Sequence, residues 1–312
     1  MTTTPALLFP GQGAQRVGMG ADLCREFPVA RQTFAEADAT LGEALSVLCF
    51  EGPEDRLTLT ENAQPALLTT STAVARVLAA EGGLVPEVAA GHSLGEWSAL
   101  VAMGAIGFAD ALAAVRARGR FMQQAVAPGV GAMSALLGAD LAVAEAMCAE
   151  ATAGGEVVVP ANVNGAGQIV VSGHAAAVAR LETLASGRKV RAMRLKVSAP
   201  FHSPLMEPAR ERMAALLREV PVTAPRGIVL GNVDAQPYSD ATSVRDRLGA
   251  QITAAVRWED CARGVAARSD RGIEVGPGKV LCGLARRIAP EFRCMPTDDL
   301  AGVRAALETV RA

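Results

Sequence analysis

The sequence has few aromatic residues and very little lysine. Phe, Trp and Tyr make up 4% of its 312 residues, and nearly all of the positive charge is arginine. Basic and acidic residues almost balance, with 30 Lys and Arg against 32 Asp and Glu. The resulting net charge of −2 means that the chain has no overall excess of positive charge to attract a nucleic acid or an anionic membrane surface. We therefore expect neither as a partner.

Long apolar runs and paired cysteine motifs are also missing. No run approaches the roughly 18 uninterrupted apolar residues that a membrane-spanning helix needs. The N-terminal segment lacks a basic region, and Pro10 and Gly11 end its apolar stretch, so we expect no signal peptide. The six cysteines are scattered without a C-x-x-C pair. We therefore predict reduced thiols in a cytoplasmic protein, with neither a disulfide framework nor a metal site.

The apolar pattern predicts an α/β architecture. Short apolar runs at 6–9 and 88–90 are typical of buried strands, whereas residues 63–81 and 108–126 repeat their apolar positions with helical spacing. Such alternation over 312 residues predicts one large domain or two ordinary ones.

A different pattern occupies residues 128–196. Strands are predicted at 133–137, 157–159, 169–172 and 190–197, and helices at 141–151 and 175–185. This β-α-β-β-α-β order is that of a ferredoxin-like subdomain. Because the earlier alternation resumes afterwards, we interpret the segment as an insertion in a core formed by 1–127 and 197–312.

Residues 91–95 carry the clearest local signal of catalysis. They read G-x-S-x-G between a predicted strand and a predicted helix, which is the context of a nucleophile elbow. The tight turn presents the Ser93 hydroxyl above the sheet, and free N–H groups at the helix N-terminus face any oxyanion formed there. We predict that Ser93 is a nucleophile.

The chain contains three histidines that could serve as the base for Ser93. His92 leaves the turn in a different direction, so we expect it to form a wall of the site or a packing contact, and His174 falls at a predicted turn. Elimination favours His202, with a pKa within about one or two units of 6.5. No acid stands out as a third member, and a backbone carbonyl or an amide is an alternative partner for the imidazole.

Two glycine-rich loops fail as nucleotide-binding motifs. Arg16 replaces the third glycine of G-x-G-x-x-G after Gly11 and Gly13, and Val280 stands where a P-loop has Ser or Thr. We expect the first loop to bring backbone N–H groups toward Ser93.

Several longer motifs occur in order along the chain: FPGQGAQ at 9–15, NAQPALL at 62–68, GHSLGEWSAL at 91–100, RGRFMQ at 118–123, NVNGAGQIVVSG at 162–173, VSAPFHSPLM at 197–206, GNVDA at 231–235 and EVGPGKVL at 274–281. Together they resemble the malonyl-CoA:acyl-carrier-protein transacylase family, which also supplies acyltransferase domains of polyketide synthases. The resemblance covers essentially the whole chain and implies an α/β-hydrolase-like core with a ferredoxin-like insertion.

The resemblance also implies roles for individual residues. Ser93 matches the acylated serine and His202 its base, and the backbone N–H groups of Gln12 and Leu94 match the oxyanion hole. Arg118 matches the arginine that binds the free carboxylate of malonate, for which a guanidinium fork is well suited.

Further positions match the surroundings of the family's active site. A bulky Phe201 fits a malonyl preference, and a backbone carbonyl near Arg257 is implied as the partner of the histidine. The resemblance implies no metal, nucleotide or redox cofactor. Other matched pocket positions are Gln64, His92, Asn162 and Gln168.

We therefore expect a monomeric acyltransferase that passes malonate from malonyl-CoA to acyl carrier protein in fatty-acid synthesis. A trans-acting polyketide-synthase acyltransferase is an alternative, and an acyl hydrolase and a catalytically silent docking module are rivals. Arg286 and Arg287 are candidates for carrier-protein docking.

Overall fold

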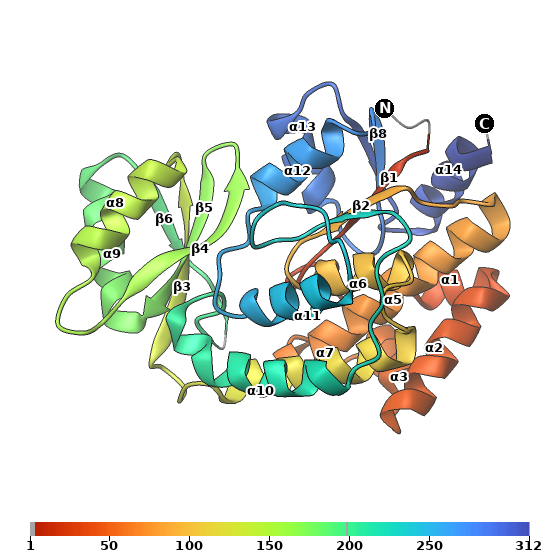
Figure 1. Cartoon of the computed structure of the whole chain (residues 1–312), viewed down its shortest axis with the longest axis horizontal. Coiled ribbons are helices and arrows are strands. Elements are labelled where there is room, and N and C mark those ends of the chain that lie inside the picture. Colours follow the sequence, from red (N-terminus) through yellow and green to blue (C-terminus); the bar gives the residue numbers. More distant parts are fainter. Residues whose placement is uncertain (1–3, 198, 312) are drawn as a thin grey trace.

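The computed structural model describes residues 4–197 and 199–311, and it contains two separate sheets (Figure 1). Ser198, which belongs to the motif at 197–206, lies outside the described residues. Among the described residues, no helix combines the length and apolar character that crossing a bilayer requires.

The first sheet is parallel and has five strands in the order β7-β2-β1-β8-β9. Successive side chains of a strand point to opposite faces, and both faces of this sheet are buried. In β1, Leu7 and Phe9 join one hydrophobic cluster while Ala6 and Leu8 join another. This explains the short, wholly apolar runs in the sequence. The strands are β1 (Ala6–Phe9), β2 (Val88–Gly91), β7 (Ile228–Leu230), β8 (Arg271–Glu274) and β9 (Arg293–Pro296).

The second sheet is antiparallel, with the order β4-β5-β3-β6, and helices α8 and α9 pack against it. This is the predicted ferredoxin-like arrangement, and the predicted segment 128–196 encloses all four strands. The observed β4 is longer than predicted because the strand continues through a polar, bulged stretch that lacks an apolar run. The elements are β3 (Gly131–Leu137), α8 (Leu141–Ala151), β4 (Val158–Gly165), β5 (Gln168–His174), α9 (Ala175–Gly187) and β6 (Arg191–Arg194).

The remaining helices surround the parallel sheet, and the long α5 packs against α2, α6, α7 and α14. They are α1 (Ala21–Glu26), α2 (Pro28–Leu41), α3 (Leu45–Glu51), α4 (Glu54–Leu57), α5 (Thr60–Gly82), α6 (Leu94–Ala102), α7 (Phe108–Gln124), the 3₁₀ turn η1 (Pro204–Met206), α10 (Glu207–Glu219), α11 (Ala241–Ala250), α12 (Trp258–Ala266), α13 (Val280–Ile288) and α14 (Leu300–Arg311).

Backbone hydrogen bonds join the inserted sheet to the core. The N–H of Val256 donates to the carbonyl of Ala161 at 2.9 Å, and the N–H of Val163 donates to the carbonyl of Val256 at 2.8 Å. These bonds hold the middle of β4 against the core and thereby fix the position of Asn162 beside the ends of the parallel strands.

A disulfide joins Cys282 of α13 to Cys294 of β9. The prediction of reduced thiols is therefore wrong for this pair. The two cysteines are 12 positions apart and their Cα atoms lie 5.1 Å apart, because the chain turns back from α13 to place β9 beside β8. The remaining four cysteines are free and buried.

This pairing predicts a defined product of digestion without reductant. Trypsin should release segments 280–286 and 294–304 as one disulfide-linked species that separates after reduction. Replacing both cysteines by alanine should lower the free energy of unfolding by up to about 3 kcal/mol, the chain-entropy value for so short a loop. Complete alkylation of Cys282 and Cys294 in the native, unreduced protein would contradict the pairing.

Candidate active site

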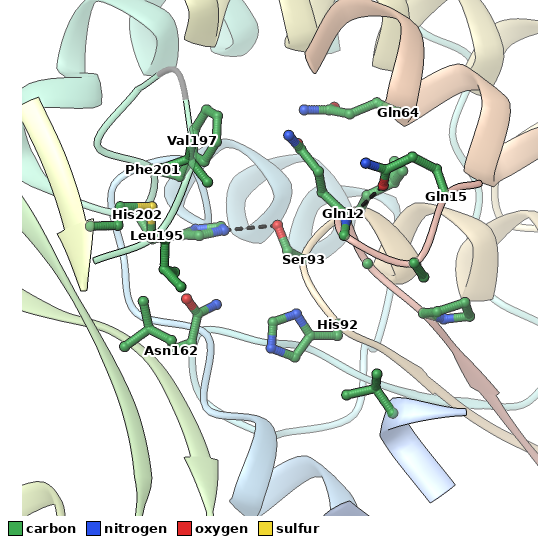
Figure 2. A pocket seen from close by; sticks show the side chains of 18 of the residues that line it. Gln12, Gln15, Gln64, His92, Ser93, Asn162, Leu195, Val197, Phe201 and His202 are labelled. Carbon is green, nitrogen blue, oxygen red and sulfur yellow. Dashed lines mark hydrogen bonds between the residues drawn. The ribbon is translucent and has the colours of Figure 1, made fainter. Parts of the chain in front are cut away.

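Ser93 lies in a strained turn between β2 and α6, with φ 51° and ψ −103°. The flanking glycines are required by close packing. A Cβ atom on Gly91 would lie 1.9 Å from the carbonyl carbon of Gly95, and a Cβ on Gly95 would lie 2.0 Å from the carbonyl oxygen of Phe9. The turn predicted from G-x-S-x-G is thus present, and the side chain of Ser93 faces the cavity (Figure 2).

His202 is the histidine that contacts Ser93. Its Nε2 lies 2.8 Å from Ser93 Oγ, although 109 positions separate the two residues (Figure 2). Its Nδ1 lies 2.8 Å from the backbone carbonyl oxygen of Gln251. A carbonyl only accepts, so Nδ1 carries the proton and the Nε2 lone pair is left to accept the hydroxyl proton of Ser93.

The partner of the imidazole is therefore a backbone carbonyl, one of the alternatives that the sequence left open. It belongs to Gln251, which directly follows α11 and lies six positions before Arg257. The backbone N–H of Arg257 instead donates to the carbonyl of Asn232 at 2.9 Å.

Burial and the nearby charge of Arg118 keep His202 neutral. Desolvation lowers the pKa of His202 most, and the positive charge of Arg118 lowers it further, to about 3. This value lies below the range of about one or two units around 6.5 that the sequence predicted, so that prediction is wrong, because the sequence reveals neither the burial nor the neighbouring cation. A neutral imidazole is the form that can act as a general base.

Arg118 is buried beside the nucleophile, with 1% of its surface exposed. Its Nη1 donates to Gln64 Oε1 at 2.8 Å, and its Nη2 donates to Gln251 Oε1 at 2.7 Å and to Ser93 Oγ at 3.2 Å. Burial lowers its pKa to about 10, so the guanidinium remains charged at neutral pH. The arrangement provides a fixed positive charge next to the serine hydroxyl.

The predicted oxyanion donors lie at the same end of the sheet. Leu94 is the first residue of α6, so its backbone N–H has no acceptor within the helix. Gln12 follows β1 in the first glycine loop and lies beside Ser93 in Figure 2. Its side chain donates to Thr60 Oγ1 at 3.3 Å. These positions suit two N–H groups that converge on a developing oxyanion.

A cavity of about 490 Å³ opens over Ser93 between the two sheets. Gln168 lies at the start of β5, paired with Leu137, and is not among the described residues that line the cavity. His92 forms a wall, as predicted, with its Nε2 2.9 Å from Asn164 Oδ1. Besides Ser93 and His202, the predicted residues that line the cavity are Gln12, Gln64, His92, Leu94, Arg118, Asn162 and Phe201.

The third histidine has a structural role outside the cavity. The ring Nδ1 of His174 accepts a hydrogen bond of 3.0 Å from the backbone N–H of Val157. His174 is the residue before α9, but its side chain makes no capping bond to that helix. His174 is thus the last residue of β5 rather than a turn residue, so the predicted turn is absent at this position.

Three polar residues that support the site were not singled out from the sequence. Asn232 Oδ1 accepts a bond of 2.7 Å from the backbone N–H of Ser93, and Glu96 and Gln251 are bonded to the same cluster. Glu96 lies in the motif GHSLGEWSAL and Asn232 in the motif GNVDA, so membership of a family motif was the signal that could have identified them. Nothing in the local sequence marks Gln251.

Comparisons with known proteins find similarity over nearly the whole chain. The model of the acyl transferase domain family matches residues 6–302. The malonyl CoA-acyl carrier protein transacylase of Salmonella typhimurium is 45% identical over 305 residues, which cover 97% of this chain and 98% of that protein.

Two solved structures show the same similarity in three dimensions. The malonyl CoA-acyl carrier protein transacylase from Coxiella burnetii has a TM-score of 0.95 and 38% identity, covering 99% of this chain and 98% of that chain. A malonyl-transacylase in complex with its type II PKS acyl-carrier protein has a TM-score of 0.95 and 41% identity, covering 98% and 99%.

The lowered pKa of His202 predicts an imidazole that does not titrate near neutrality. The Cε1 proton resonance of His202, assigned by its loss in His202→Gln, should keep a constant chemical shift between pH 8 and pH 5. The chain has three histidines, so only three Cε1 proton resonances have to be distinguished. An inflection near pH 6.5, the ordinary value for a solvated histidine, would contradict the buried, neutral state.

Proposed function

Because the chain belongs to the acyl transferase domain family, we propose that it transfers the malonyl group of malonyl-CoA to the phosphopantetheine thiol of an acyl carrier protein. The observation that carries this proposal is the buried Arg118 guanidinium, whose Nη2 lies 3.2 Å from the Ser93 hydroxyl. Within the described residues its side-chain partners are uncharged, namely Gln64, Gln251 and Ser93. A malonyl group attached at Ser93 would bring the missing carboxylate to that cation.

In the first half-reaction, Ser93 Oγ attacks the thioester carbon of malonyl-CoA while Nε2 of His202 takes the hydroxyl proton. The oxyanion of the tetrahedral intermediate is stabilised by the N–H groups of Gln12 and Leu94. Collapse breaks the carbon–sulfur bond, and the imidazolium returns the proton to the departing CoA thiolate. The product is a malonyl ester of Ser93 and free CoA.

In the second half-reaction, the carrier thiol takes the place of CoA. His202 accepts the thiol proton as the sulfur attacks the ester carbon, the same N–H groups hold the oxyanion, and Ser93 leaves with the proton. Both half-reactions balance with these residues and the two substrates, so we propose neither a metal nor a cofactor. Ping-pong kinetics follow from the covalent intermediate.

We propose fatty-acid synthesis as the pathway. The similar structure in complex with a PKS carrier protein makes polyketide synthesis the second candidate. Arg286 and Arg287 are both exposed on α13, while Val280 at the start of that helix lines the cavity and is 60% exposed. Docking through this helix stays a prediction, and transfer rates to carrier proteins from the two pathways separate the candidates.

The acylation site is tested by intact mass spectrometry after incubation with a mixture of acyl-CoAs. The wild-type protein should gain one malonyl group, and peptide mapping should place it on Ser93. Ser93→Ala should fold normally and gain none, because among the cavity-lining residues that the structure describes, Ser93 is the hydroxyl in contact with a histidine base. Labelling of a cysteine instead would contradict the mechanism, and hydrolysis faster than transfer to carrier protein would favour an acyl hydrolase.

Removing the guanidinium should change substrate selectivity. Arg118→Ala should lower kcat/KM for malonyl-CoA by roughly 30- to several thousand-fold, because losing one partner of a buried charge pair costs about 2–5 kcal/mol. Transfer of acetyl groups, which carry no carboxylate, should stay level or rise.

The control for Arg118→Ala is Arg120→Ala on the same helix. Arg120 is exposed and pairs with Glu61, so both substrates should react at wild-type rates. An equal loss for malonyl and acetyl transfer in Arg118→Ala would mean that Arg118 supports the fold or binds CoA.

A further inference from the structure

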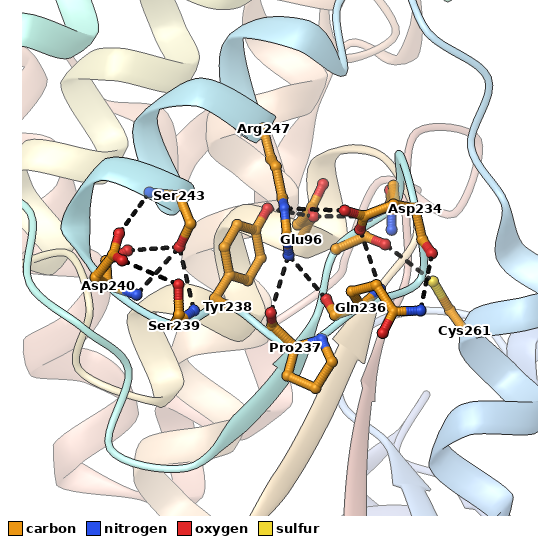
Figure 3. A network of polar contacts seen from close by, with 12 residues as sticks. Glu96, Asp234, Gln236, Pro237, Tyr238, Ser239, Asp240, Ser243, Arg247 and Cys261 are labelled. Atoms are coloured by element: carbon orange, nitrogen blue, oxygen red, sulfur yellow. Dashed lines mark hydrogen bonds and ion pairs between the residues drawn. The ribbon is translucent and has the colours of Figure 1, made fainter.

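Glu96 is a carboxylate with no exposed surface, three residues after Ser93 on α6. Its Oε1 accepts hydrogen bonds from the Tyr238 hydroxyl at 2.5 Å and from the backbone N–H of Asn232 at 2.8 Å, and its Oε2 accepts one from the side-chain amide of Gln251. Figure 3 shows Glu96 next to Tyr238. All three partners are donors, which is the environment of an ionised carboxylate.

The bond from Gln251 determines how that amide is oriented. A carboxylate only accepts, so the NH₂ of Gln251 faces Glu96 and the amide oxygen faces the opposite way. That oxygen accepts from Arg118 Nη2 at 2.7 Å. The reversed amide would place its NH₂ against the guanidinium and its oxygen against the carboxylate, so that both contacts become repulsive. The carboxylate of Glu96, together with the Ser93 backbone carbonyl that accepts from the same NH₂ at 3.0 Å, therefore fixes the acceptor that aims Arg118.

The same cluster holds the nucleophile and the base. The NH₂ of Gln251 also donates to the backbone carbonyl of Ser93 at 3.0 Å, and its main-chain carbonyl is the partner of His202. Asn232, held by Glu96 through its backbone N–H, bonds the N–H of Ser93 and the carbonyl of Gly91. The bonds of Glu96 to Asn232 and Gln251 thus reach Ser93 and His202 as well as Arg118.

Glu96 also balances the charge of Arg118 without occupying its binding face. No direct bond joins the two side chains in the described structure, because the Gln251 amide lies between them. Burial raises the pKa of Glu96 most, to about 7, while the hydrogen bonds from Tyr238, Asn232 and Gln251 and the positive charge of Arg118 lower it, so the carboxylate form predominates above pH 7. A carboxylate in direct contact with Arg118 would compete with the substrate, whereas one held behind an amide does not.

We propose that Glu96 is a positioning residue that acts through the side chain of Gln251 to aim the Arg118 guanidinium at the carboxylate of the acyl group. This inference rests on the proposed malonyl transfer. It assigns selectivity for a dicarboxylic acyl group to a relay of three side chains, Glu96, Gln251 and Arg118, of which only Arg118 touches the substrate.

The test is the ratio of malonyl to acetyl transfer in Glu96→Gln, which keeps the shape of the side chain but removes its charge. The kcat/KM for malonyl-CoA should fall about 10- to 100-fold, the range expected for one charge-assisted hydrogen bond. The loss should appear mainly in KM, because Arg118 binds the carboxylate in the ground state too. The acetyl rate should fall by a smaller factor, because the acetyl group makes no contact with Arg118 and loses only the support that Glu96 gives to Ser93 through Asn232, so the malonyl-to-acetyl ratio should decrease.

A double-mutant cycle separates positioning from general destabilisation. In the Arg118→Ala background, Glu96→Gln should cause little further loss of malonyl transfer, because the guanidinium that it aims is gone. Gln251→Met, which keeps the main-chain carbonyl for His202 but removes the amide, should reproduce the loss of selectivity. It also tests the relay if Glu96→Gln does not fold.

The matched control is Glu274→Gln. Glu274 is also fully buried, but its carboxylate accepts backbone N–H bonds from Leu281 and Cys282 at the start of α13. This variant should keep the wild-type malonyl-to-acetyl ratio even if it lowers stability.

Three results would overturn the relay. They are an unchanged malonyl-to-acetyl ratio in Glu96→Gln, an unchanged ratio in Gln251→Met, and a full additional loss from Glu96→Gln in the Arg118→Ala background. Failure of the wild-type protein to load malonate is a separate outcome that defeats the proposed function and this inference with it.

Discussion

A positive charge buried beside the nucleophile is the constraint on which the rest of the site depends. Taking a guanidinium out of water costs several kcal/mol unless its N–H groups are bonded and its charge is balanced. Here two amides, from Gln64 and Gln251, accept from Arg118, and the balancing carboxylate of Glu96 lies behind the second amide. The guanidinium is held in place and still lacks a carboxylate of its own.

The same constraint governs the acid–base chemistry. Burial lowers the pKa of His202 most, and the positive charge of Arg118 lowers it further, so the imidazole stays neutral and able to accept a proton. Gln251 connects the two effects, since its side chain bonds Arg118 and its main-chain carbonyl bonds His202 Nδ1. Substrate recognition and proton transfer are therefore parts of one hydrogen-bonded cluster.

The two sheets place this cluster in a groove. The elbow and the first glycine loop follow β2 and β1, whose carboxyl ends lie at one edge of the parallel sheet. The inserted sheet is fastened there by the bonds of β4 to Val256, and it supplies Asn162 and Asn164 to the cavity wall. The inserted sheet thus forms one wall of the cavity over Ser93.

Local sequence was sufficient wherever neighbouring residues control the backbone. The apolar runs predicted β1 and β2, the order of elements predicted the inserted sheet, and the glycines of 91–95 predicted the turn at Ser93, because these features depend on sterics and periodicity within a few positions. The family motifs added Arg118, which local pattern alone could not distinguish from Arg116 and Arg120 on the same helix.

Only the tertiary structure decided which groups are buried together. The partners of Arg118 lie 54 and 133 positions away in the chain, the carbonyl that orients His202 carries no side-chain signal, and the pairing of Cys282 with Cys294 depends on the turn from α13 to β9. The pKa of His202 and the relay from Glu96 follow from the same packing. Burial and contacts between distant segments determine how far each ionisable group is desolvated and which charges lie near it. Both are established only when the chain has folded.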